Sequence, residues 1–286
     1  MAATDGLVIK VVNIVAFLAL LGSNIYSVAG PTDIYKNVKD TYVTPSYYAN
    51  YIWSLIHFLL IGTMCYQFTE KGKAIIVDGV QWRFALLAVL NFAYVWLWGH
   101  HWYITSFILS LLVSATVSQI YYIIKTAHRR ETLAQEVFVH APFSLWHGFS
   151  IVLVVISGFT AFGRDAAKHP HVGLWSKVFV FLAFVFLEST AVGYAWASRE
   201  GDIAGASERL TRLPFHFSLD TQVIAFSLFA IFIRQTHSKF VHWSAFAFFI
   251  LSLFNIIKSV YGTVRSGNSI LDDEERAPLV SGAGSS

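Results

Sequence analysis

Residues 139–162 read VHAPFSLWHGFSIVLVVISGFTAF, and this stretch indicates the fold class of the chain. It contains no Lys, Arg, Asp or Glu. A helix needs about 20 predominantly apolar residues to cross the hydrocarbon core of a bilayer, and a buried strand of a soluble sheet needs far fewer. We therefore predict that this stretch is a transmembrane helix.

Further apolar stretches of similar length occupy most of the remaining chain. They lie at 7–28, 47–68, 82–98, 104–124, 175–197, 215–233 and 240–261. The stretch 82–98 is short, and 215–233 carries His216 and Asp220 near its start. Taken together they predict an all-α, polytopic integral membrane helix bundle with about eight transmembrane helices.

The composition supports a membrane protein and excludes several other classes. Of the 286 residues, 56% are hydrophobic and 13% are charged, whereas a soluble domain carries about 25% charge. The formal net charge of +3 is too small to indicate nucleic acid as a partner. Motifs for phosphate binding, nucleophilic triads and zinc are missing from the sequence. We therefore expect that the protein is not an enzyme, has no metal site and requires no cofactor. Its expected partner is the lipid bilayer.

Lys and Arg between the predicted spans set the orientation, because loops rich in these residues stay in the cytosol. Alternate connecting segments place eleven of them on one side and six on the other. The richer side holds Lys71, Lys73, Arg83, Lys125, Arg129, Arg130, Arg199, Arg209, Arg212, Arg265 and Arg276. The poorer side holds Lys36, Lys39, Arg164, Lys168, Arg234 and Lys239. With an even number of spans, both termini are predicted to be cytosolic.

The chain turns polar after the last apolar stretch, so residues 263–286 are predicted to form a disordered cytosolic tail. Residues 275–280 read ERAPLV, which resembles an acidic dileucine sorting signal. That interpretation would direct the protein to a vacuolar or other endomembrane compartment. The alternative is an ordinary solvated tail.

Strongly polar side chains inside the predicted spans are candidates for function, because they are costly in lipid and usually face the bundle interior. They are His57, Asn91, His147, Glu188 and Asp220. Glu188 lies near the middle of its span, where it is either a hydrogen-bonded packing residue or a group that handles protons or a ligand. The two histidines would also fit a bis-histidine haem site if their ring nitrogens converged on one iron.

Three segments resemble the tryptophan-rich sensory protein and translocator protein family. They are residues 45–57 (PSYYANYIWSLIH), 90–98 (LNFAYVWLW) and 142–148 (PFSLWHG). Their order and spacing agree with the family over roughly residues 5–165. The chain departs from the family pattern at Thr44, Ala49 and His57, where the family has proline, an aromatic residue and tyrosine. Because of these departures, the ligand preference of the family does not carry over directly to this chain.

The resemblance implies a translocator-like bundle of five helices over residues 1–165, followed by three additional transmembrane helices over 166–262. It also implies an aromatic pocket for a hydrophobic small molecule such as a tetrapyrrole or a sterol. We predict binding or sensing of such a molecule inside the membrane. The pocket residues that we expect are Trp53, His57, Asn91, Trp96, Trp146 and His147.

Two alternatives to ligand binding stay open. The first is a proton-coupled secondary transporter that uses Glu188 or Asp220 as the proton-coupling group. The second is a structural membrane subunit without a ligand. The sequence leaves the oligomeric state open, with a homodimer among the expected assemblies.

Overall fold

The computed structural model describes residues 6–29, 39–127, 132–169, 171–200 and 219–275, and all regular elements in them are helices. The long helices are α1 (Leu7–Ala29), α2 (Tyr51–Tyr66), α4 (Arg83–Gly99), α5 (Tyr103–Ala127), α7 (Ala141–Phe162), α8 (Leu174–Glu200), α9 (Leu219–Arg234) and α10 (Lys239–Glu275). Shorter helical segments precede some of them: η1 (Tyr47–Asn50), α3 (Glu70–Gly72), η2 (Lys73–Val80), α6 (Leu133–Gln135) and η3 (Glu136–His140).

Six segments of the described chain are long and apolar enough to cross a membrane. A seventh is obtained if Glu70–Val80 and Arg83–Gly99 form one span, although the two helices are bent by 64°. α9 has 16 residues, and the predicted span containing it begins at residues 215–218, which lie outside the described residues. The prediction of an all-helical, multi-pass membrane protein is confirmed, and the count of eight stays a prediction.

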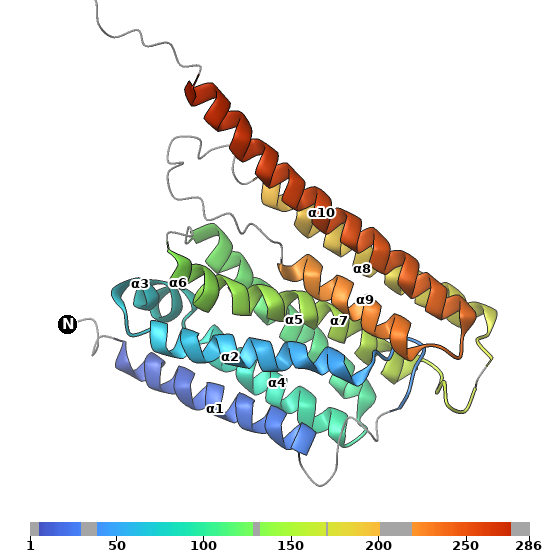
Figure 1. The fold of residues 1–286 in the computed structure, drawn as a ribbon. Helices are drawn as coiled ribbons and strands as arrows, with labels where there is room; N and C mark the ends of the chain where they lie inside the picture. The colour runs from blue at the N-terminus through green and yellow to red at the C-terminus, as the bar shows by residue number, and fades with distance from the viewer. Residues whose placement is uncertain (1–5, 30–38, 128–131, 170, 201–218, 276–286) are drawn as a thin grey trace, which may run out of the picture.

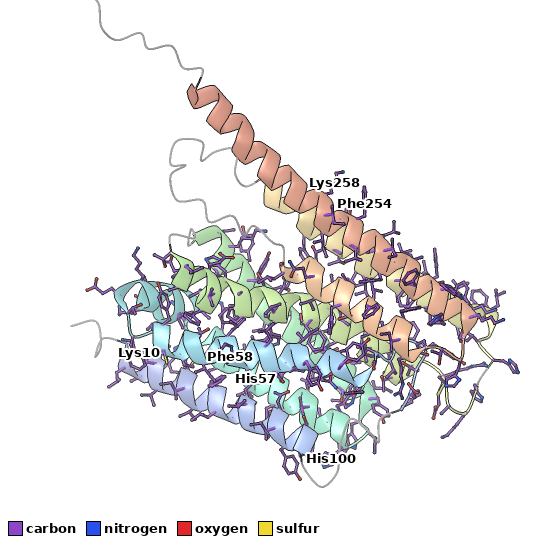
Figure 2. All side chains as sticks on the ribbon, in the orientation of Figure 1. Lys10, His57, Phe58, His100, Phe254 and Lys258 are labelled. Carbon is purple, nitrogen blue, oxygen red and sulfur yellow. The ribbon has the colours of Figure 1, made fainter. Side chains whose placement is uncertain are left out.

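The helices form one bundle in which most neighbours run side by side (Figure 1). α4 packs on α1, α5 packs on α4 and α7 packs on α5. α2 lies against α7, and α9 joins α7 to the pair formed by α8 and α10. Large apolar side chains such as Phe58 and Phe254 point out of the bundle (Figure 2), as expected for a surface in contact with lipid acyl chains.

The contact between α2 and α7 depends on a π-helical turn, η3, at the start of the α7 segment. The ring of Phe138 in η3 covers Gly62 of α2 so closely that an added Cβ would lie 2.0 Å from the ring atom Cδ1. The hydroxyl of Thr63 donates a hydrogen bond to the carbonyl oxygen of Phe138. A widened turn of this kind re-aims the helix that follows it. η3 therefore fixes how α7 faces α2.

Residues 39–46 hold the opposite end of the bundle together. Lys39 Nζ donates to the carbonyl oxygens of Thr160 and Gly163 at 3.0 and 2.6 Å, where the end of α7 favours a cation. Gln235 Nε2, just after α9, donates to the carbonyl oxygens of Thr41 and Thr44, both at 2.9 Å. These bonds join α9 to the first half of the chain. The predicted domain boundary at residue 165 stays a prediction.

The last described helix is longer than the predicted span. α10 continues to Glu275, so the tail boundary predicted at residue 263 does not coincide with the end of the helix. Residues 276–286, which contain most of the sorting-signal candidate, lie outside the described residues.

Candidate functional site

An aromatic cluster fills the contact between α2 and α7. The ring centroids of Trp53 and Trp146 lie 5.6 Å apart in an edge-to-face arrangement, and Phe149 lies 5.6 Å from Trp53. Trp53 and His57 are four residues apart and share a helical face, with ring centroids 5.7 Å apart. Phe17 of α1 closes the cluster at 6.4 Å from His57. The structure therefore brings together three of the predicted site residues.

His57 lies midway along α2 (Figure 2), and its ring has one engaged and one unengaged nitrogen. Nδ1 lies 2.6 Å from the carbonyl oxygen of Trp53. Because a carbonyl oxygen only accepts, Nδ1 carries a hydrogen and donates it. In the neutral ring Nε2 then presents a lone pair. This atom is buried and has no hydrogen-bond partner among the described residues.

Two further helices bring unpaired polar atoms to the interior. Trp146 is fully buried, and its Nε1–H has no partner in the described part of the chain. Asn91 of α4 is also fully buried, and neither its amide nitrogen nor its oxygen finds a partner there. A buried polar atom without a hydrogen bond costs about 1–3 kcal/mol. These atoms lie on α2, α7 and α4, and α7 contacts both α2 and α4. They indicate groups that a ligand or water can complete.

Trp96 does not join this cluster. Its side chain is 48% exposed, and its indole lies against His100, with ring centroids 4.1 Å apart. It faces out of the bundle because Trp96 is five residues after Asn91, which places the two side chains about 140° apart around α4. The structure therefore places Trp96 outside this cluster.

His147 belongs to a second, polar cluster. Its Nδ1 lies 3.5 Å from Oδ1 of Asp220 in α9, and its Nε2 lies 3.3 Å from the hydroxyl of Tyr194 in α8. Tyr121 of α5 stacks on the imidazole at 4.5 Å and donates to Asp220 Oδ2 at 3.0 Å. Trp146 and His147 are consecutive, so their side chains point about 100° apart. The two histidines accordingly face different neighbours, so the structure does not bring them together as the bis-histidine haem alternative would need.

Glu188 lies in a third place, between α8 and α10. Its Oε1 accepts a hydrogen bond from Asn255 Nδ2 at 2.7 Å, and its Oε2 accepts one from the hydroxyl of Ser252. Both carboxyl oxygens are therefore satisfied by α10. This geometry is that of a polar contact between two helices. Glu188 and Asp220 therefore have different hydrogen-bonding partners.

Several residues of these clusters were absent from the sequence prediction. Tyr121, Tyr194 and Phe149 are aromatic residues in spans rich in aromatics, so nothing in the sequence distinguished them. Gly148 gave a usable signal, because a glycine beside an intramembrane histidine permits close helix packing. An added Cβ there would lie 2.8 Å from the Cα of Asp220. Among the described residues, no group of three or more His, Cys, Asp or Glu side chains is arranged to hold a metal ion.

The comparisons with known proteins give one match. The family model described as TSPO-like protein matches residues 10–258. No curated protein and no solved structure matches the chain. The matched segment begins in α1, ends in α10 and includes the three motifs that resemble the translocator family. α8, α9 and the part of α10 up to residue 258 thus fall within the family model, and the chain belongs to the TSPO-like protein family.

Proposed function

We propose that this protein binds a flat, hydrophobic small molecule between α2, α4 and α7, inside the membrane. The observation that carries the proposal is the set of buried polar atoms without partners: His57 Nε2, Trp146 Nε1 and the side-chain amide of Asn91. Trp146 is itself a member of the Trp53–Trp146 aromatic pair, and the ring of His57 lies 5.7 Å from that of Trp53. Apolar walls with a few polar groups are typical of small-molecule sites.

The unpaired atoms define the polar groups that the ligand should carry. His57 Nε2 needs a donor, Trp146 Nε1–H needs an acceptor, and Asn91 can serve either. A tetrapyrrole offers pyrrole N–H groups on a flat apolar ring, and a sterol offers one hydroxyl that both donates and accepts. Both classes fit the proposal.

Ligand entry requires the indoles of Trp53 and Trp146 to separate, because their rings are in edge-to-face contact at 5.6 Å. Such a contact contributes about 0.5–1.5 kcal/mol beyond its buried area. Stacking of an extended ring system on both indoles can compensate for this loss. We therefore propose binding by rearrangement of the aromatic pair.

We propose eight spans, both termini in the cytosol and residence in an endomembrane. We also propose that the protein is not an enzyme and requires no cofactor. Proton-coupled transport is the second candidate function, and the contact between His147 and Asp220 favours it.

Equilibrium binding to the full chain in lipid nanodiscs tests the proposal. Protoporphyrin IX, followed by its absorbance, and tritiated cholesterol represent the two ligand classes. We expect saturable binding of at least one of them. His57→Leu, which removes the lone pair of Nε2, should weaken it about fivefold or more, whereas the outward-facing variant Trp96→Phe should not. Binding that never saturates, or that is equal in both variants, would contradict the proposal.

A further inference from the structure

The polar cluster around His147 is separate from the proposed ligand site. Asp220 and His147 are both more than nine-tenths buried. The titratable groups that face them come from each helix packed around them: Tyr121 and Lys125 of α5 and Tyr194 of α8. We propose that His147 and Asp220 form a proton-binding site that takes up one proton from the end of the bundle marked by Lys125.

The approach of His147 Nδ1 to Asp220 Oδ1 fits a hydrogen placed between the two atoms. They lie 3.5 Å apart, and neither has a hydrogen-bond partner among the described residues. Two facing lone pairs would repel each other in the membrane interior. In the proposed site the imidazole carries this hydrogen on Nδ1 and directs it at the carboxylate, as histidine does beside an acidic partner.

The other ring nitrogen is where the site gains or loses its proton. In the neutral imidazole, Nε2 is an acceptor, and the hydroxyl of Tyr194 donates to it over 3.3 Å. In the imidazolium, Nε2 donates and the oxygen of Tyr194 accepts. Uptake of one proton thus reverses the direction of this hydrogen bond. The Asp220 carboxylate balances the added positive charge.

A path from water to the site follows α5. Lys125 is exposed and stands near the end of the span Tyr103–Thr126. Its Nζ lies 3.4 Å from the hydroxyl of Tyr121, which is 3.0 Å from Asp220 Oδ2. The ammonium of Lys125, the hydroxyl of Tyr121 and the carboxylate of Asp220 therefore form a chain of polar groups from the surface to His147. This end of the bundle is the one that we predicted to face the cytosol.

The proton site links parts of the chain that the sequence predicted to be separate. His147 and Tyr121 lie in the first five spans, whereas Tyr194 and Asp220 lie in the additional helices. Gly148 lets the backbones of α7 and α9 meet closely at this point. Protonation would change the hydrogen bond between α7 and α8. The proposal goes beyond ligand binding and would hold even if the α2–α4–α7 site bound nothing.

Solid-state ¹⁵N NMR of the full chain in lipid nanodiscs, with labelled histidine, tests the site by titration. The His147 signal is identified by its loss in His147→Gln. Asp220→Asn removes the carboxylate in contact with the imidazolium. We therefore expect this variant to lower the proton affinity of His147 at least about tenfold. The matched control is Asp78→Asn, which changes an exposed carboxylate that pairs with Lys73, and it should change the affinity less than about twofold.

A second variant keeps the test decisive if Asp220→Asn does not fold. Tyr194→Phe keeps the ring and the His147–Asp220 pair but removes the oxygen that accepts from the protonated imidazole. The charged form loses the stronger bond, so the proton affinity should fall about threefold or more. An affinity within twofold of wild type in every variant that folds would overturn the proposal.

Discussion

Trp146→Phe should weaken ligand binding while leaving the stability of the protein nearly unchanged. The wild-type indole is fully buried, and its N–H has no partner among the described residues. Removal of that unpaired donor recovers a desolvation cost of about 1–3 kcal/mol. The smaller ring leaves a void, and voids of this size destabilise by a similar amount. The two effects oppose each other, so the free energy of unfolding should change by less than about 1 kcal/mol.

The effect of Trp146→Phe on the ligand has no such compensation. The complex loses an N–H donor and part of a stacking surface, which together contribute roughly 1 kcal/mol or more. The dissociation constant for protoporphyrin IX should therefore rise about fivefold or more. Absorbance titration in nanodiscs measures the affinity, and unfolding in mixed micelles measures stability. Trp53→Phe should behave similarly, and Trp96→Phe is the control. Unchanged affinity in both interior variants would refute the reasoning, and so would a stability loss above about 3 kcal/mol in Trp146→Phe.

Three further predictions address packing and topology. Gly62→Ala should destabilise the protein by about 1–3 kcal/mol in the same unfolding assay, because the new methyl group would overlap the η3 phenyl ring; Gly22→Ala, which meets nothing within 4 Å, should cost nothing, and equal stabilities would exclude the close contact. Glu188→Leu should destabilise the α8–α10 contact by about 1–3 kcal/mol, since its two donors lose their acceptor, and Glu188→Gln should cost less; the reverse order would contradict a packing role. Reporter tags at Met1 and Ser286 should both be cytosolic. Tags on opposite sides of the membrane would mean that the predicted number of spans is too high by one, and α9 would be the first helix to reassign.

The spans were predictable where the sequence excludes charge over a long stretch. Residues 139–162 fall inside the helical segment Leu133–Phe162, because no other structure satisfies the backbone of so long an apolar stretch in lipid. The bend before α4 was not predictable. It follows from Gln81, whose φ of 56° breaks the helix between η2 and α4, a conformation that glutamine rarely adopts.

The candidate site was predictable in part. Trp53 and Trp146 were predicted to line one pocket, and the structure places their rings in contact. Their contact with a ligand stays a prediction. Trp96 was misplaced, because in a membrane the outer face of a helix is as apolar as the inner one, so hydrophobicity does not distinguish the two. The separation of His147 from Trp146 follows from helical geometry alone. Its partners Tyr121 and Tyr194 depend on the packing of four helices, which no local pattern encodes.

Photo-crosslinking can show whether a ligand binds between α2, α4 and α7. A diazirine-bearing sterol or porphyrin is bound to the full chain in nanodiscs and irradiated, and the modified residues are identified by mass spectrometry. His57 and Phe58 are adjacent on α2, yet the first is buried and the second faces outward (Figure 2). We expect adducts at Trp53, His57 or Trp146 that an excess of unlabelled ligand suppresses. Adducts confined to outward-facing side chains such as Phe58 and Phe254, and insensitive to competition, would contradict this expectation.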